Sequence, residues 1–272
     1  MNSLILPIQF RNIQRITSVH GSLSMNPFAI VFAFLVSLLV AVSAASFPNI
    51  AHGSEPAILE PDDGIFSTYG PIDPYYIRVN ELLLADHQYR KCQMLFMPAF
   101  QNEGIVYIVR DQDSTKISVV TKEIQPKLWS AMMDVLWRES DGKSISLKAD
   151  SQYHALNKVT VHVTTKTAQI DPATADLLEA IWEAILKNIE YPDLATYGKD
   201  GVTYHAAHYF SGLGYRAGKT WSPKKGTQAS DFIQIAEALR DFANADEKVQ
   251  PAKHEQLLAL AKGFRGRLGS HK

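Results

Sequence analysis

Short strand-like segments that come in pairs, separated by helical segments, constrain the fold of this chain most. Apolar residues alternate with polar ones, or cluster in short runs, at residues 92–97, 104–110, 116–121, 143–148, 158–167, 202–209 and 215–220. Neighbouring runs are joined by turns, such as the one at 111–114, and no regular βαβ alternation is present. This order predicts an α+β fold: one domain in which helices flank a largely antiparallel sheet.

Capping residues and apolar periodicity predict the helices. Asp73 before Pro74, and Asp171 before Pro172, are typical helix starts, because aspartate caps the first turn and proline fits its first position. The helix that begins at Pro172 is predicted to reach Ile189. Further helices are predicted around 129–137, after a cap at Ser230 and over 251–262.

An uncharged apolar stretch at residues 28–45 predicts export from the cytoplasm. Its length fits the core of a signal peptide or one membrane-spanning helix. Small residues at Val42 and Ala44 predict cleavage after Ala44, which gives a periplasmic or secreted protein. The alternative is a retained N-terminal transmembrane anchor. Translation starts at Met1 or at Met25, and the sequence leaves this choice open.

Composition shifts divide the chain into four parts. Residues 1–44 are the signal peptide or anchor, and residues 45–72 are rich in proline and glycine and predict an extended linker or arm. Residues 73–266 form the single α+β domain, and 267–272 are a short tail. A membrane contact is expected only through residues 28–45, and only if they are not removed.

Charge and cysteine content exclude several classes of protein. The chain has 27 basic and 28 acidic residues and a net charge of −1, so it lacks the basic character by which proteins hold nucleic acid. Only one stretch is apolar enough to cross a bilayer, which excludes a polytopic membrane protein. Cys92 is the single cysteine of the chain. It lies in an apolar run, which predicts a buried and chemically inert thiol.

Three local patterns are weighed as chemical sites and set aside. The run from Gly212 to Thr220 resembles a phosphate-binding loop, but its glycine spacing is wrong. His205 and His208 are three residues apart on a predicted strand, so their side chains point to opposite faces and do not form a metal pair. Glu60, Asp62 and Asp63 form an acidic cluster that is expected to be solvated. No cofactor or metal is therefore predicted.

Aromatic and polar residues are concentrated between residues 200 and 226. Large rings with polar tips are common on binding surfaces, and also on ordinary sheet edges. As a binding surface, this segment has five candidate residues, namely Tyr204, His205, Tyr215, Lys219 and Trp221. Trp129 and Trp137, by contrast, are expected to belong to the core.

The same segment carries a resemblance. The runs Asp200 to His205 (DGVTYH) and Gly214 to Pro223 (GYRAGKTWSP), followed by Gly226, resemble a pattern in uncharacterised exported proteins of proteobacteria. The similarity covers roughly residues 170–245. It implies a location outside the cytoplasm and no particular activity.

Three functions fit these observations. The first is a non-enzymatic module that binds another protein of the envelope, for example an immunity-type inhibitor of a secreted toxin. It is favoured because no matching set of acid, base and nucleophile is present. The second is a small periplasmic hydrolase or ligand-binding enzyme that uses His205 with Tyr204 or Lys219. The third is a structural envelope protein. Whether the protein is an enzyme stays open, with the missing catalytic set arguing against it.

Overall fold

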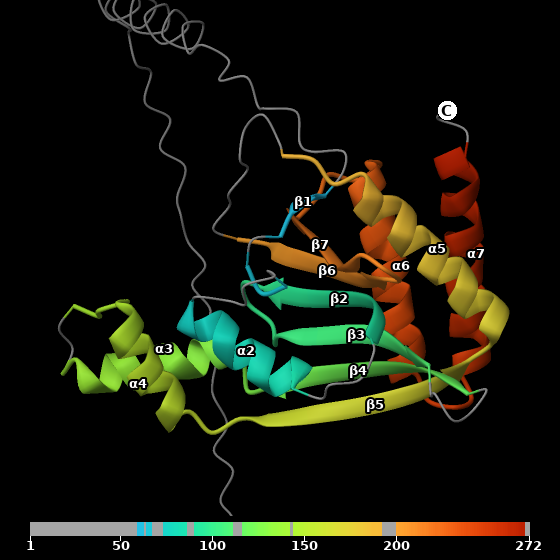
Figure 1. Ribbon diagram of the computed structural model, residues 1–272. Helices are drawn as coiled ribbons and strands as arrows, with labels where there is room; N and C mark the ends of the chain where they lie inside the picture. Colours follow the sequence, from blue (N-terminus) through green and yellow to red (C-terminus); the bar gives the residue numbers. More distant parts are fainter. Residues whose placement is uncertain are drawn as a thin grey trace, which may run out of the picture. The chain divides into compact units, whose positions relative to one another are not determined.

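A seven-stranded antiparallel sheet organises the part of the chain that the computed structural model describes (Figure 1). The described residues are 59–62, 64–66, 73–85, 90–110, 116–141, 144–191 and 200–269, and all belong to one compact unit. The strands follow the order β1-β7-β6-β2-β3-β4-β5, and each neighbouring pair is antiparallel. The predicted α+β class with an antiparallel sheet is confirmed.

The elements follow one another along the chain with these bounds: β1 Glu60–Pro61, α2 Pro74–Leu84, β2 Arg90–Pro98, β3 Gly104–Arg110, β4 Ile117–Gln125, α3 Leu128–Glu139, α4 Ala149–Lys158, β5 His162–Ile170, α5 Pro172–Lys187, β6 Val202–Phe210, β7 Gly214–Trp221, α6 Gln228–Asn244 and α7 Gln250–Gly269. Asp73 caps α2 and Asp171 caps α5, as predicted. The cap of α6 is Thr227, whose side chain accepts from the N–H of Ser230, so the predicted cap at Ser230 was wrong.

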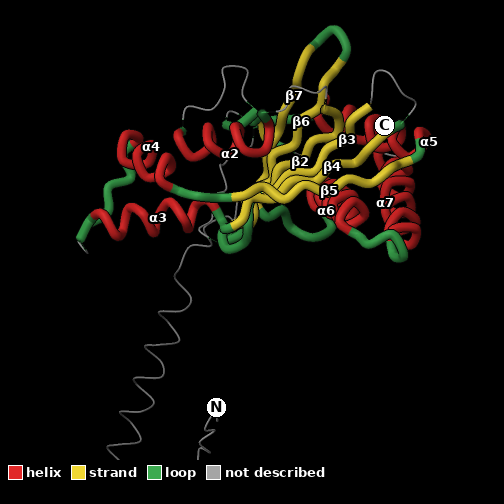
Figure 2. Tube along the Cα trace, turned by 90° about the horizontal axis from the view of Figure 1, so that it is seen from below, coloured by secondary structure: helices red, strands yellow, loops and turns green. Residues whose placement is uncertain are grey.

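Helices cover the two faces of the sheet unequally (Figures 1 and 2). Helices α5, α6 and α7 pack on one face, called here the α5 face, where Trp182 meets the ring of Phe232 at a centroid distance of 4.6 Å. Helix α2 packs on the other, the α2 face, over a second cluster that includes Leu83, Leu95 and Ile105. Helices α3 and α4 lie beyond one end of the sheet and complete this second cluster.

Two predictions around α4 were wrong. Residues 144–148 form no regular structure, although a strand was predicted at 143–148, and the helix α4 that follows was not predicted. The predicted strand at 158–167 begins four residues later, as β5, because Lys158 still ends α4. Val159 and Val161 pack on the α2-face cluster instead. Strand β5 is an edge of the sheet, and most of its residues are exposed.

Part of the predicted arm belongs to the folded unit. Strand β1 pairs with β7, with Glu60 opposite Lys219, and the side chains of Leu59 and Ile65 are buried. The described part of the domain therefore begins at Leu59, ahead of the predicted boundary at 73. The remaining arm, the predicted turn at 111–114 and the predicted signal peptide lie outside the described residues. Within the described part, no helix is long and apolar enough to span a membrane.

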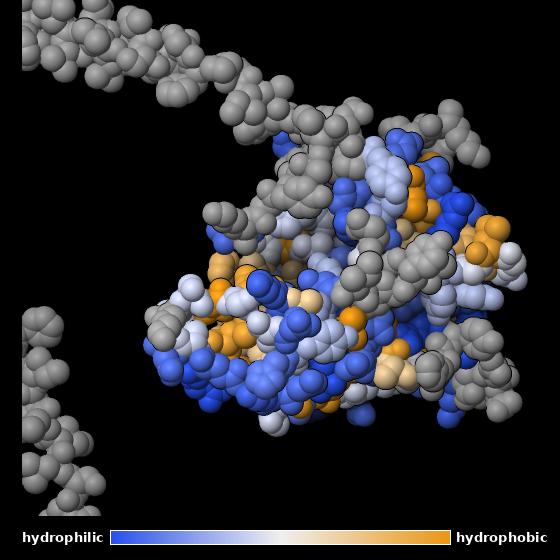
Figure 3. All heavy atoms as spheres, turned by 60° about the vertical axis from the view of Figure 1, so that its left-hand side comes forward, coloured by the Kyte–Doolittle hydropathy of each residue, from blue (hydrophilic) through white to orange (hydrophobic). Residues whose placement is uncertain are grey.

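Trp129 and Trp137 are exposed, and their prediction as core residues was wrong. Helix α3 buries Leu128, Met132, Val135 and Leu136 instead. Both sets satisfy helical spacing, so the periodicity of the sequence does not decide between them. Figure 3 shows apolar side chains interrupting a mostly hydrophilic surface on the side where α2, α3 and α4 lie.

A buried carboxylate fixes the start of α3. The side chain of Glu103 accepts hydrogen bonds from the N–H groups of Leu128 at 2.8 Å and Trp129 at 3.2 Å, and from the Tyr75 hydroxyl at 2.6 Å. The N-cap residue, Lys127, makes no capping bond with its own side chain. Glu103 thus replaces a local cap, and it joins α3 to α2 through Tyr75.

We expect Glu103→Ala to lower the free energy of unfolding by about 3 kcal/mol, because two helix N–H groups and the Tyr75 hydroxyl lose a buried acceptor. Urea unfolding followed by circular dichroism measures this change. Glu255→Ala, on the exposed side of α7, is the matched control and should change stability by no more than about 0.5 kcal/mol. Equal effects of the two substitutions would contradict the role of Glu103.

Candidate functional site

The β6–β7 hairpin places four of the five predicted binding residues on the α2 face. Residues directly opposite each other in an antiparallel pair share a face, and the register pairs His205 with Lys219, Tyr209 with Tyr215 and Thr203 with Trp221. His205 contacts the ring of Tyr76 in α2, with 5.9 Å between ring centroids. His205, Tyr215, Lys219 and Trp221 therefore lie on this face.

Tyr204 is separated from the other four candidates. Its side chain is largely buried on the α5 face, packs edge-on against Phe96 and donates to a carboxylate oxygen of Glu237 at 3.2 Å. Burial, together with Glu237, raises the pKa of the Tyr204 hydroxyl to about 12. The other candidates are also spread out, because six residues of extended strand, or about 20 Å, separate Tyr215 from Trp221.

The side chains of His205 and His208 diverge, as the sequence predicts. The ring of His208 lies on the α5 face, where its Nδ1 accepts from the N–H of Cys92 at 3.3 Å and its Nε2 lies 3.8 Å from a Glu183 oxygen. Burial, with the charge of Lys91, lowers the pKa of His208. Among the described residues, no group of three or more potential ligands could hold a metal ion.

His205 is paired with Asp62, a residue that was expected to be solvated. Its Nδ1 lies 3.0 Å from an oxygen of Asp62, and the Asp62 side chain is 0% exposed. The other Asp62 oxygen accepts from the N–H of Gly64 at 2.7 Å. Burial alone would raise the pKa of this carboxyl. The bonds and charge of His205, the Gly64 N–H and the charge of Lys219 together hold it below its ordinary value.

The second ring nitrogen of His205 is enclosed. Its Nε2 is buried and makes no hydrogen bond within the described part of the chain, and the side chain is only 2% exposed. A carboxylate on Nδ1 leaves Nε2 available as a proton acceptor, which is the arrangement of a general base. In this structure the pair instead joins the 59–66 segment to β6, beneath α2.

An extra residue in β2 brings two polar side chains to the α2 face. Lys91 pairs with Ile108 and Met94 with Val106, so β2 carries one residue more than β3 over this interval. Cys92 lies at this bulge with a φ of 50°. The bulge turns both Arg90 and Gln93 towards α2. Lys91 lies on the α5 face, 2.7 Å from a Glu179 oxygen.

Cys92 itself is buried, as predicted. Burial, followed by the nearby charge of Glu179, raises its thiol pKa well above the usual value. The thiolate is therefore scarce, and the side chain is shielded from reagents.

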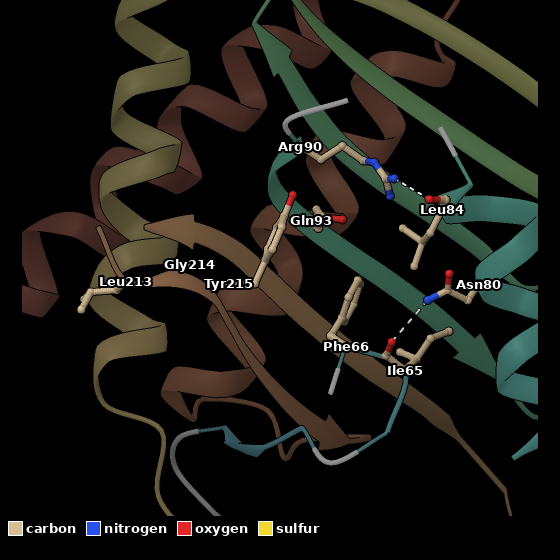
Figure 4. A pocket seen from close by; sticks show the side chains of 9 residues that line it. All are labelled: Ile65, Phe66, Asn80, Leu84, Arg90, Gln93, Leu213, Gly214 and Tyr215. Carbon is tan, nitrogen blue, oxygen red and sulfur yellow. Dashed lines mark hydrogen bonds between the residues drawn. The ribbon is translucent and has the colours of Figure 1, made fainter. Parts of the chain in front are cut away.

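A pocket of about 480 Å³ lies on the α2 face beside the hairpin (Figure 4). Four segments form its wall: α2, the turn at 64–66, the start of β2 and the tip of the β6–β7 hairpin. Figure 4 shows the rings of Phe66 and Tyr215 directed towards Gln93 at the centre of the group, with Leu213 farther out. The described residues that line it are Ile65, Phe66, Asn80, Leu84, Arg90, Gln93, Leu213, Gly214 and Tyr215.

The pocket combines apolar walls with a few polar groups, as small binding sites commonly do. Arg90 donates from its guanidinium to the carbonyl of Leu84 and lies 5.5 Å from the centre of the Tyr107 ring. Asn80 donates to the carbonyl of Ile65 at 3.5 Å. The Ile65 and Phe66 wall belongs to the segment that the Asp62–His205 pair joins to the sheet.

Sequence reasoning found one residue of this pocket, Tyr215. A polar Gln93 within the apolar run 92–97 is the signal that could have indicated a second. The sequence around Asp62 gave no comparable indication that this residue is buried and paired with His205. No family model, curated protein or solved structure matches this chain, so the proposals below depend on its own geometry.

We expect the Asp62–His205 pair to make stability depend on pH. Because the folded pKa of Asp62 is below its ordinary value of 3.8, the pair contributes fully above about pH 5, and its contribution is lost as pH falls through the folded pKa. Asp62→Asn should lower the unfolding free energy by about 1–3 kcal/mol at pH 7. The difference from wild type should shrink on acidification.

Urea titrations at several pH values measure this difference. Asp134→Asn, on the exposed side of α3, is the control and should stay within about 0.5 kcal/mol of wild type at pH 7. A difference between wild type and Asp62→Asn that stays constant down to pH 2 would count against the pair as the source.

Proposed function

We propose that this protein is a non-enzymatic binding protein that holds another protein at the tip of its β6–β7 hairpin. The observation that carries this proposal is the exposure of two large apolar side chains there. Leu213 is 70% exposed and Tyr215 is 49% exposed, next to the pocket. Figure 2 shows the hairpin projecting beyond the rest of the sheet.

This surface has the features of a protein interface. Tyrosine is enriched where binding energy is concentrated, because its ring supplies contact area at little conformational cost. The ring of Tyr215 is held by Tyr209, with the centroids 5.3 Å apart and the planes at 69°. At such a surface the pocket can accept a side chain of the partner, and the exposed apolar side chains beside it can pack against the partner at the same contact.

The other reactive side chains argue for binding rather than catalysis. His205 is enclosed with Asp62, and the Cys92 thiol is buried with a raised pKa. Lys219 lies 3.9 Å from Glu60 and is part of the contact between β1 and β7. None of these three groups lines the pocket.

The proposed place of action is outside the cytoplasm, after export directed by residues 28–45. An immunity-type inhibitor of a secreted toxin is one form that such a binding protein would take. Support for this part of the proposal comes from the sequence alone.

A second candidate, an acid–base enzyme, is favoured by one observation: Asp62 holds Nδ1 of His205, so Nε2 can accept a proton. Because the His205 side chain is only 2% exposed, substrate would have to displace part of its surroundings to reach Nε2. Any hydrolytic activity found in a substrate screen should then be lost in both His205→Gln and Asp62→Asn. Activity that persists in either folded variant would remove this candidate.

We expect the hairpin tip to determine capture of a partner. The full chain with a C-terminal affinity tag should recover a stoichiometric protein from its own envelope fraction. Leu213→Ala/Tyr215→Ala should reduce this recovery at least about tenfold, because two interface anchors are removed. Quantitative mass spectrometry of the eluates measures the recovery.

Phe100→Ala provides the matched control, since Phe100 is 80% exposed in the turn between β2 and β3. It should recover the partner as wild type does. Equal recovery by wild type and the double variant would place the contact elsewhere, and the proposal for this surface would then fail.

A further inference from the structure

The side-chain amide of Gln93 is the most informative group in the pocket. Gln93 is 2% exposed and lines the pocket, and its side chain makes no hydrogen bond to any described residue. A primary amide offers two N–H donors and a carbonyl acceptor. Because Gln93 lines the pocket, a ligand there that offers both an acceptor and a donor can form both kinds of hydrogen bond with this amide.

The surroundings of this amide are mostly apolar. Ile65 and Leu84 are buried, and the rings of Phe66 and Tyr215 point towards Gln93 (Figure 4). These side chains would enclose an aliphatic group next to the amide. The pocket volume, about 480 Å³, is several times the volume of one aliphatic side chain. The pocket therefore also has room for the ligand atoms on either side of that group.

The polar side chains of the pocket are one guanidinium and two amides, those of Arg90, Asn80 and Gln93. The Arg90 guanidinium is already directed to the Leu84 carbonyl and lies 5.5 Å from the centre of the Tyr107 ring. Gln93 and Asn80 are uncharged amides. A ligand with one N–H and one C=O side by side pairs with the Gln93 amide through both of its functions. In an extended peptide the N–H and the C=O of one residue point to the same side and have this arrangement.

We propose that the pocket binds an extended peptide segment with an aliphatic side chain. One backbone N–H and C=O of the segment pair with the Gln93 amide, and the side chain packs among Ile65, Phe66 and Leu84. This inference rests on the proposed function, because the segment belongs to the partner protein that the hairpin tip holds. It adds the chemistry that the pocket recognises.

A minimal probe tests the inference directly. N-acetyl-leucine N′-methylamide is titrated into the ¹⁵N-labelled full chain while the side-chain amide signals are followed by nuclear magnetic resonance. The Gln93 amide should shift and saturate in the millimolar range. N-acetyl-N-methyl-leucine N′-methylamide, which lacks the leucine N–H, and N-acetylglycine N′-methylamide, which lacks the side chain, should each bind at least about threefold more weakly.

Gln93→Met keeps the length of the side chain and removes its hydrogen-bonding groups. It should weaken binding of the leucine probe about tenfold, and it should leave the circular dichroism spectrum unchanged. Gln169→Leu, on the exposed edge strand β5, is the matched control and should bind the probe as wild type does. If Gln93→Met binds the probe as tightly as wild type, or if the Gln93 signal does not move, the inference is overturned.

Partner capture separates this inference from the proposed function. Loss of the partner in Leu213→Ala/Tyr215→Ala, with no probe binding at Gln93, would sustain the binding function and remove the peptide site. Probe binding that depends on Gln93, with no partner captured, would sustain the peptide site and remove the hairpin tip as a protein contact.

Discussion

The extra residue at Cys92 in β2 is the constraint on which the candidate site depends. Side chains alternate between the faces of a strand, so one added residue reverses the faces of everything beyond it. With strict alternation counted from Gln93, Lys91 would face α2 and Arg90 would face α5. The bulge exchanges them, which gives the pocket its arginine and gives Glu179 of α5 its lysine partner.

The bulge also links the two faces of the sheet. The N–H of Cys92, displaced from the ladder with β3, is bound by His208 of β6 at 3.3 Å. One residue later, the carbonyl of Gln93 accepts from the indole N–H of Trp182 at 3.1 Å. Helix α5 therefore fixes the backbone of the residue whose side chain lines the pocket, and the position of the Gln93 amide depends on packing on the opposite face.

The parts of the structure that local chemistry determines could be read from the sequence. The helix starts at Asp73 and Asp171 followed from caps and prolines, and residues 104–110 form a strand as predicted. The Asp62–His205 pair could not be read, because 143 residues separate its members. The bulge could not be predicted from the sequence either. A positive φ is usually marked by glycine, and the residue with the positive φ at this bulge is Cys92. Helix α4 lacked an apolar stripe long enough to predict it.

The exposed edge strand β5 has a consequence for association between copies. An edge strand of nine residues offers free backbone groups to a second sheet. If two copies paired antiparallel over the whole of His162–Ile170, the central position would oppose Lys166 of one copy to Lys166 of the other. Two ammonium groups side by side repel each other, so this symmetric register is disfavoured. The lysine at the middle of β5 thus disfavours this one symmetric pairing of two copies.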